Sequence, residues 1–242
     1  MSKFGLRKLG FGILLFGMAV CCYTASPVKA AETDVPIDNK TFPDATFLKY
    51  VGRFDKSGDG RLSESERNAV KEIVVNVDPF SSQTKITSLA GIEYFPNLTV
   101  LECEKNSLAG LDVTKNKKLQ ELNCDKNNLQ SLDVSQNTKL EGLHVYNTQV
   151  TALDLSNMTN LTTLACYNNN LTSLNISGDT ALKTLSCYQN RLTSLDIGDS
   201  SELTDVSCSQ NGITELDLSQ NTQLENLHCA NNSLTTLMSA RI

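Results

Sequence analysis

The chain has 242 residues, of which 40% are hydrophobic and 6% aromatic, with no tryptophan. This length allows one or two domains, and their core must be aliphatic. The formal net charge is −6, and residues 31–242 alone carry 17 basic against 27 acidic side chains, a net charge of −10. An anionic body without a basic cluster is a poor partner for nucleic acid or anionic lipid. The sequence has two histidines and no phosphate-binding loop, zinc-protease helix or nucleophile elbow, so most enzyme classes lack their usual motifs here.

Residues 1–30 have the organisation of a secretory signal peptide. A basic stretch precedes an apolar run at residues 9–20, and the small residues that follow suit cleavage after Ala30. The run is short for a bilayer span, so no membrane insertion is expected. A lipoprotein anchored through Cys21 is the weaker alternative, because Val20 stands where a small residue is expected. The segment also resembles signal peptides of Gram-positive cell-wall proteins, which implies a secreted or cell-wall location.

An internal repeat of 21 residues dominates the rest of the chain. Seven segments share the pattern L-x-x-L-x-C-x-x-N-x-L-x-x-L-D-L, which is that of a leucine-rich repeat with cysteine in the third apolar position. They cover residues 98–242, and the last one is incomplete. Their first leucines are Leu98, Leu119, Leu140, Leu161, Leu182, Leu203 and Leu224.

This pattern predicts a leucine-rich repeat solenoid. A short strand in each repeat sends leucine and cysteine inward and the intervening residues outward. Because no unit can bury its apolar side alone, neighbouring repeats stack, with a parallel β-sheet on the concave face and a mostly irregular convex side.

An asparagine follows the strand in six of the seven repeats. Its amide is expected to bond to the backbone of its own turn and of the next repeat. Thr148 replaces it in the third repeat, where Val145 also replaces cysteine, so a local irregularity is expected there. These asparagines are Asn106, Asn127, Asn169, Asn190, Asn211 and Asn232.

Six cysteines occupy the inward position in every repeat except the third. An even number in an exported protein is compatible with disulfides or a metal site. Each one, however, replaces a buried apolar side chain, and free cysteine behaves as a small hydrophobe. The sequence therefore favours a ladder of buried thiols, with disulfides between stacked strands as the alternative. The six are Cys103, Cys124, Cys166, Cys187, Cys208 and Cys229.

The two histidines are predicted to be surface residues. His144 and His228 occupy equivalent outward positions four repeats apart, ~19 Å at one strand spacing per repeat, so they cannot share a metal. His228 and Cys229 are adjacent on a strand and point to opposite faces, which excludes a Cys-His nucleophile.

Residues 55–66, DKSGDGRLSESE, match a twelve-residue calcium-binding loop. Oxygen donors stand at the first, third, fifth, ninth and twelfth positions, a glycine at the sixth and a backbone carbonyl at the seventh. Calcium is therefore the predicted cofactor. The alternative is a solvated acidic turn that never binds metal, since the loop has three carboxylates and no partner hand. The expected ligands are Asp55, Ser57, Asp59, Arg61 through its carbonyl, Ser63 and Glu66.

A helical cap is predicted over residues 31–69. FPDATFLKYV begins a helix with one apolar face, and Ser63 and Glu66 suit a capping box for a second helix. From Val70 the chain is expected to enter a degenerate first repeat, residues 70–97, which includes a loop insertion. The cap would cover the open hydrophobic end of the solenoid.

The segments FPDATFLKYV, DKSGDGRLSESE and ITSLAGIEYFPNLTVL, followed by the cysteine-bearing repeats, together resemble the internalin-related leucine-rich repeat surface proteins of Firmicutes. The resemblance implies a helical N-terminal cap related to calcium-binding hands and a role as an adhesin or receptor-binding protein. It also implies a C-terminal wall-sorting signal, which this sequence does not contain. Because Leu237 is followed by residues that depart from the repeat, we expect a truncated reading frame or a fragment of a longer surface protein.

The position after the inward cysteine places three tyrosines in register on consecutive repeats. Stacked tyrosines with amides beside them form a surface suited to protein or glycan. The alternative is that the rings only stabilise the sheet through cross-strand contact. The candidate ligand-binding residues are Tyr146, Tyr167, Tyr188, His144, Asn168 and Gln189.

Three function classes follow from these features. The leading hypothesis is a secreted or cell-surface binding module, monomeric and without catalytic activity, whose partner is a protein or glycan on a host or bacterial surface. The second is a structural spacer within a larger cell-wall protein. An enzyme is the least favoured, because no acid, base and nucleophile converge in the sequence.

Overall fold

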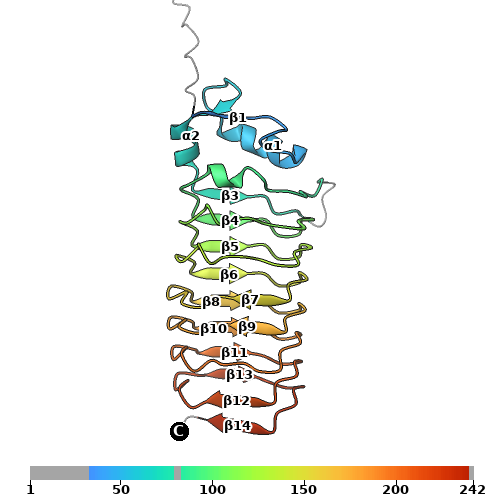
Figure 1. Ribbon diagram of the computed structural model, residues 1–242, viewed down its shortest axis with the longest axis vertical. Helices are drawn as coiled ribbons and strands as arrows, with labels where there is room; N and C mark the ends of the chain where they lie inside the picture. The colour runs from blue at the N-terminus through green and yellow to red at the C-terminus, as the bar shows by residue number, and fades with distance from the viewer. Residues whose placement is uncertain (1–32, 79–82, 240–242) are drawn as a thin grey trace, which may run out of the picture.

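The computed structural model describes residues 33–78 and 83–239, so the predicted signal peptide lies outside the described residues. The described chain is an elongated solenoid with a helical cap at one end and strands stacked below it (Figure 1). No helix in this part of the chain is long and apolar enough to cross a membrane.

Eight parallel strands form the main sheet, one from the segment after the cap and one from each repeat. The middle residue of each strand pairs with the middle residue of the next, as Leu101 does with Leu122 and Leu122 with Leu143. The register therefore advances by one 21-residue repeat per strand, and the predicted solenoid is confirmed. In spatial order the strands are β3 (Glu72–Val74), β4 (Val100–Glu102), β5 (Glu121–Asn123), β6 (Gly142–His144), β8 (Thr163–Ala165), β10 (Thr184–Ser186), β11 (Asp205–Ser207) and β13 (Asn226–His228).

The inward side chains form one continuous aliphatic core that includes the cysteines. All six repeat cysteines are free thiols, five of them buried and Cys229 half-buried. The Cys103 thiol donates to the carbonyl of Asn123 in the following repeat at 3.4 Å. Burial raises the pKa of the Cys166 thiol to about 12 and that of Cys208 to about 11, so both stay protonated at neutral pH. The buried-thiol interpretation is confirmed for five of these residues, and Cys229 is a free thiol that is only half-buried.

A ladder of buried asparagines follows the main strands. The Nδ2 of Asn127 donates to the carbonyls of Cys103, Cys124 and Asp125 at 3.0, 3.0 and 3.1 Å. Its Oδ1 accepts from the N–H of Leu108 at 3.0 Å. The bonds to its own turn confirm the prediction, but the other partners belong to the preceding repeat, so the expected bond to the next repeat is wrong.

The direction of these bonds follows from strand geometry. The N–H and C=O of one strand residue point to the same neighbouring strand. Because the N–H of Cys103 donates to Asn123 in the following repeat, its carbonyl also faces that repeat. The asparagine of the following repeat is therefore the group that reaches it.

The third repeat keeps the register of the sheet despite its two replacements. Val145 and Thr148 are both buried. The Oγ1 of Thr148 lies 2.7 Å from Oδ1 of Asn169 and 3.2 Å from the carbonyl of Val145, so its single proton can replace one of the missing amide's hydrogen bonds. β6 pairs with β8 residue by residue, so the expected irregularity does not reach the main sheet.

The convex side contains two further pairs of short parallel strands. β7 (Ala152–Asp154) pairs with β9 (Ser173–Asn175), and β12 (Glu215–Leu218) pairs with β14 (Thr236–Ser239). Leu237 and Met238 in β14 are 52% and 46% exposed. The last described strand therefore leaves apolar surface open to solvent.

A second row of buried polar side chains supports the convex side. Asn116, Asn137 and Asn221 are at most 3% exposed. Each donates through Nδ2 to two carbonyls of the preceding repeat, at 2.9–3.1 Å. These amides satisfy backbone groups in the turns that connect the strands.

Asp179 takes the asparagine position of this second row in the fourth repeat. Its side chain is 0% exposed. Oδ1 accepts from the N–H of Met158 at 2.7 Å, whereas Oδ2 has no hydrogen-bond partner. Burial raises its pKa to about 7, and Asp154 and Asp199 add to that rise. A carboxyl group therefore stands where repeats 1, 2 and 6 use an amide donor, whereas Met158 and Ser200 occupy this position in repeats 3 and 5.

The cap is a helix-loop-helix segment. Asp44 begins its first helix by accepting from the N–H groups of Thr46 and Phe47, and Ser63 with Glu66 forms the predicted capping box. β2 lies inside the loop and pairs antiparallel with β1. The elements are β1 (Val35–Pro36), α1 (Ala45–Val51), η1 (Gly52–Phe54), β2 (Arg61–Leu62) and α2 (Glu64–Ala69).

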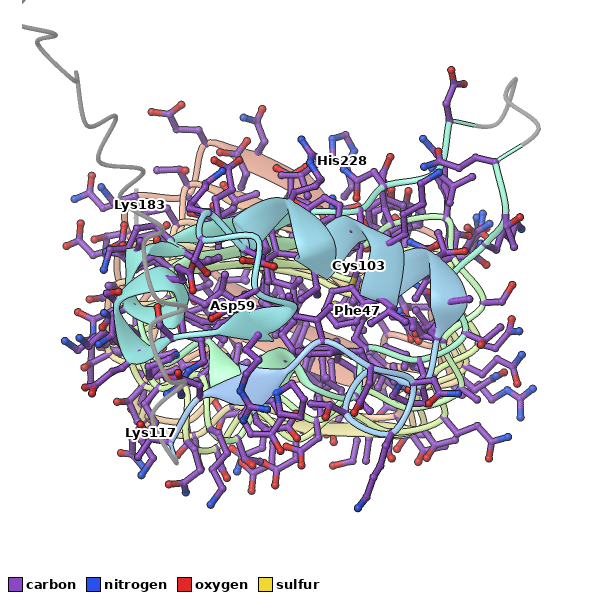
Figure 2. The ribbon with its side chains drawn as sticks, turned by 90° about the horizontal axis from the view of Figure 1, so that it is seen from above. Phe47, Asp59, Cys103, Lys117, Lys183 and His228 are labelled. Atoms are coloured by element: carbon purple, nitrogen blue, oxygen red, sulfur yellow. The ribbon has the colours of Figure 1, made fainter. Side chains whose placement is uncertain are left out.

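Aromatic side chains join the cap to the solenoid. Phe42, Phe47 and Phe95 are 0% exposed, with the ring centroid of Phe42 5.9 Å from Phe47 and 6.5 Å from Phe95. Gly91 has a φ of 100° and its backbone faces the ring of Phe42, so no larger residue fits there. Figure 2, which views the solenoid from the cap, shows Phe47 over its interior and His228 near its edge. The cap thus covers the first layer of the core, as predicted.

The degenerate first repeat leads from the cap into the sheet. α2 ends at Ala69, and β3 supplies the first strand of the main sheet with Ile73 buried. After residues 79–82, which are not described, Ile86 and Leu89 return to the core. A 3-10 helix, η2 (Ile92–Tyr94), then leads into the first complete repeat.

Candidate functional site

The outer face of the main sheet, opposite the core, corresponds to the predicted concave face. Its side chains form rows that run from repeat to repeat, because the register advances by 21 residues at each strand. The row that follows the inward position changes from acidic to aromatic to small along the solenoid. It consists of Glu104, Asp125, Tyr146, Tyr167, Tyr188, Ser209 and Ala230.

The three tyrosines of this row form one stack. The ring centroids of Tyr146 and Tyr167 are 4.3 Å apart with planes inclined by 10°, and those of Tyr167 and Tyr188 are 4.4 Å apart and inclined by 9°. All three side chains are half-buried. Because the rings cover each other's faces, the stack offers mainly ring edges and hydroxyl groups to solvent. The predicted register of the three tyrosines on consecutive repeats is confirmed, and their rings form one continuous strip.

Two charged residues, Lys126 and Asp125, contact Tyr146 at the N-terminal end of the tyrosine stack. Lys126 Nζ lies 5.4 Å from the centroid of the Tyr146 ring, a cation–π distance. Asp125 is 1% exposed; its Oδ1 accepts from the N–H of Tyr146 at 2.7 Å, and its Oδ2 has no hydrogen-bond partner. Burial raises the pKa of Asp125 to about 7, and Glu104 adds to the rise. Burial and the Asp125 charge also raise the pKa of Tyr146.

The other predicted ligand-binding residues lie beside the stack. His144 is half-buried on β6 and points to the same face as Tyr146, two residues before it. Asn168 and Gln189 are exposed and follow Tyr167 and Tyr188, with positive φ angles of 53° and 55°. The side-chain amide of Asn168 donates to that of the equivalent residue in the preceding repeat. The structure therefore brings all six candidates onto one surface.

Sequence reasoning did not identify the contact between Glu121 and the third repeat. The carboxylate of Glu121 occupies the space where a Cβ at residue 142 would be, so Gly142 is required for this arrangement. Burial raises the pKa of Glu121, His144 opposes that rise, and Glu141 adds to it. The signal available in the sequence was the single glycine in a row of larger outward residues.

The predicted calcium loop is held together by its first and last carboxylates. Asp55 accepts from the hydroxyl of Ser57 and from the N–H groups of Gly58 and Gly60, at 2.6–3.0 Å. Gly58 and Gly60 have positive φ angles of 71° and 77°, which allows the loop to wrap around Asp55. Asp59 accepts from the N–H of Arg61 at 2.9 Å and is otherwise exposed.

Glu66 folds back across the same loop. Its Oε1 accepts from the N–H groups of Lys56 and Ser57 at 2.7 and 3.1 Å, and its Oε2 from the N–H and hydroxyl of Ser63 at 2.8 and 2.7 Å. Burial opposes ionisation, but these hydrogen bonds, led by those from Ser63, lower the pKa of Glu66 to about 2. Glu66 is therefore ionised at neutral pH.

The loop has the oxygen donors that calcium prefers, but they are not gathered around one point. Among residues 33–78 and 83–239, no three His, Cys, Asp or Glu side chains lie close enough together to hold a metal ion. Asp55 and Glu66 bond to N–H groups of the loop instead. Each oxygen of Glu66 already accepts two hydrogen bonds, so an ion bound by Glu66 would have to take the place of some of these donors.

Solved structures of other proteins share the leucine-rich repeat fold of this chain. No family model and no curated protein sequence matches the chain. The solved functional domain of InlJ from Listeria monocytogenes, which includes a cysteine ladder, is 32% identical with a TM-score of 0.67, and the match covers 86% of this chain and 49% of that one. Internalin C2 from the same organism is 25% identical with a TM-score of 0.71, covering 86% of this chain and 92% of that one.

More distant structures share the architecture. A leucine-rich repeat protein from Leptospira interrogans is 26% identical with a TM-score of 0.59, and the match covers 73% of this chain and 47% of that one. The ectodomain of a plant membrane receptor kinase from Arabidopsis thaliana, solved in complex with Casparian strip integrity factor 2, is 19% identical with a TM-score of 0.55. That match covers 72% of this chain and 25% of that one and shows the fold alone.

The chain spans about half the length of the InlJ structure that it matches. The two Listeria structures share with it both the repeat architecture and at least a quarter of the aligned residues. This chain is a leucine-rich repeat protein related to the internalins.

Proposed function

We propose that this protein is an exported, monomeric and non-catalytic binding module that recognises a protein or glycan on a host or bacterial surface. The binding region is the outer face of the main sheet around the tyrosine stack. The observation that carries the proposal is the contact between the three rings, because it produces one continuous patch across three repeats.

Two further facts support binding over a purely structural role. The inward leucines and cysteines already form a complete core, so the rings are not needed to close it. Tyrosine also combines rigid apolar area with a hydroxyl group, which makes it frequent at binding hot spots.

Replacing Tyr146, Tyr167 and Tyr188 together by serine should abolish retention of the labelled chain, residues 31–242, on the cells that bind the wild type. Each hot-spot residue contributes about 1 kcal/mol or more, so the triple change should lower affinity by at least a hundredfold. Retention on epithelial cells and on bacterial cells is the measurement, with circular dichroism to verify folding.

A control triple variant changes exposed threonines of the same repeats, Thr151, Thr172 and Thr193, to alanine and should bind as the wild type does. A folded tyrosine variant that binds normally would place the site elsewhere. A tyrosine variant that unfolds would favour the structural role of the stack, and a wild type that binds no cell would favour the spacer.

We also propose that the cap loop binds one calcium ion through Asp55, Asp59 and Glu66. The spacing of the oxygen donors along the loop and its glycine-dependent conformation support this proposal. Calorimetry should show one site with a Kd in roughly the micromolar to millimolar range, and calcium should raise the melting temperature because it binds the folded cap.

Substitutions should show whether the loop carboxylates bind calcium or only make hydrogen bonds within the loop. Asp59 makes only one hydrogen bond within the loop, and an asparagine oxygen can still accept it, so Asp59→Asn should weaken calcium binding and leave the fold intact. Glu66→Ala should remove binding, and the exposed Glu64→Gln is the control. Unchanged calcium heat in Asp59→Asn and Glu66→Ala would show that calcium binds outside this loop and would overturn the assignment.

A further inference from the structure

A hollow lies where the cap meets the first strand of the main sheet. It has a volume of about 600 Å³, in the middle of the range for small-molecule sites. One wall is α1 with η1, and the other is β3 with the residues that follow it; α1 lies next to β3 at the cap end of the solenoid (Figure 1). β4 and β5 separate β3 from β6, ~14 Å in all, so the hollow is distinct from the tyrosine stack.

One side of the first helix faces the hollow. Its lining residues are spaced by three, four and seven positions, which places them on one helix face. The backbone stays helical through Gly52, with φ −54° and ψ −18°, so this face continues from α1 into η1. The hydroxyl of Tyr50 accepts from the N–H of Val74 at 3.0 Å, which ties the helix to β3. The residues of this face are Thr46, Lys49, Tyr50 and Arg53.

The opposite wall of the hollow is largely apolar. It includes Val74, Val77 and Ile86. Val77 and Ile86 are at most 6% exposed, whereas Val74 is 38% exposed. The other exposed large hydrophobic residues of the described chain, Leu237 and Met238, lie at the far end of the solenoid. A ligand with an apolar body would therefore remove the Val74 side chain from water.

Two cations stand at the hollow without an acidic partner. The guanidinium carbon of Arg53 lies 5.0 Å from the centroid of the Tyr50 ring, a cation–π distance. In the described part of the chain the ion pair that forms is Lys105 with Glu104, and the hollow is lined by no aspartate or glutamate. The position of Lys49 in the last turn of α1 suits the helix dipole but leaves its N–H donors open to a ligand.

We propose that this hollow binds a small organic anion, a carboxylate carried on an apolar body. The carboxylate accepts hydrogen bonds from Lys49 and Arg53, and the apolar body packs on Val74, Val77 and Ile86. The two positive charges disfavour a cationic ligand, and a small inorganic anion would leave the apolar wall in water. This site goes beyond the proposed surface binding, since it uses neither the tyrosine stack nor the calcium loop.

Backbone amide resonances of residues 31–242 test the site. The Val74 amide lies at the hollow and should shift saturably. The Leu237 amide, beside the exposed apolar surface of β14, should not shift and therefore controls for adsorption on any apolar surface. The probes are phenylacetate, 1-naphthylacetate and hexanoate, each compared with its neutral primary amide. At least one anion should bind with a Kd in roughly the millimolar range, and its amide should bind about tenfold or more weakly.

Variants of the two cations identify the groups that hold the carboxylate. Lys49→Gln and Arg53→Gln should each raise the Kd of the responding anion about threefold, and the double variant about tenfold or more, because each exposed charge pair contributes up to about 1 kcal/mol. Lys117→Gln is the matched control: it removes one charge from an exposed lysine outside the hollow and should leave the Kd unchanged. Circular dichroism verifies that each variant folds.

Three results would overturn the anion site. The first is the absence of a saturable Val74 shift with all three anions up to about 20 mM, well above the expected Kd. The second is equal binding of an anion and its amide, or a wild-type Kd in the folded double variant. The third is a Leu237 shift that follows that of Val74. Cell retention of the tyrosine variant tests the surface-binding function separately, so either proposal can fail without the other.

Discussion

Replacing Asn127 by alanine is expected to lower the free energy of unfolding by about 3 kcal/mol or more. The side-chain amide satisfies the carbonyls of Cys103 and Cys124 and the N–H of Leu108, all in the buried interior. Alanine would leave these groups without that partner, and each unsatisfied buried group costs about 1–3 kcal/mol. Because the bonds join two repeats, the loss should weaken the interface between repeats 1 and 2.

Chemical denaturation measures the overall effect, and hydrogen exchange at the Leu108 amide locates it. Asn128→Ala is the control, since Asn128 is the next residue and its side chain is exposed. This control should change stability by no more than about 0.5 kcal/mol. Equal stability of the two variants would mean that the asparagine ladder does not hold the repeats together.

Asp179→Asn is expected to stabilise the protein by about 2 kcal/mol at pH 8, because it removes a buried charge with an unpartnered oxygen. Asparagine would also restore the Nδ2 donor that Asn116, Asn137 and Asn221 use at the same place in other repeats. The gain should be largest at high pH, where the carboxyl group of Asp179 is ionised.

The pH dependence follows from the direction of the pKa shift. Burial raises the pKa of Asp179 in the folded state from 3.8 to about 7, so the folded chain holds this proton over a pH range in which the unfolded chain has lost it. The stability contributed by the protonated group is complete below the unfolded pKa and is lost as the pH rises through the folded one. The free energy of unfolding of Asp179→Asn should therefore not show this loss as the pH rises.

Urea denaturation of both proteins between pH 4 and pH 8 checks this expectation. Asp125 has a similarly raised pKa and remains in both proteins, so the difference between them isolates Asp179. Asp133→Asn, at an exposed aspartate of the second repeat, is the control and should leave the pH profile unchanged. A constant difference between the Asp179 variant and the wild type across this range would contradict the assignment.

The sequence predicted which residues form the candidate site but not how their side chains are arranged. The 21-residue period places Tyr146, Tyr167 and Tyr188 in one row, and the structure confirms that row. The period does not specify rotamers, so it could not show that the rings cover one another. It also could not show Glu121 crossing Gly142, because that contact depends on the direction of a long side chain.

In the cap, too, the sequence predicted the residues of the loop but not the contacts of their side chains. The loop residues from Asp55 to Glu66 fit a calcium pattern by spacing alone. Spacing does not say where each carboxylate oxygen points, and in the structure Glu66 bonds to the N–H groups of Lys56, Ser57 and Ser63. The strand partner of the loop, β1, was likewise not recognisable, since two residues carry no periodicity.

The sequence by itself determined the solenoid, its register, the inward leucines and the buried thiols. It could do so because each repeat contacts mainly its neighbours, so one pattern at a fixed offset describes the whole core. Only the tertiary structure decided that Asn127 bonds to the preceding repeat, that Asp179 is buried with an unpartnered oxygen, and that the carboxylate of Glu121 lies over Gly142. These features depend on strand direction, rotamers and the packing of adjacent repeats, which a periodic pattern does not encode.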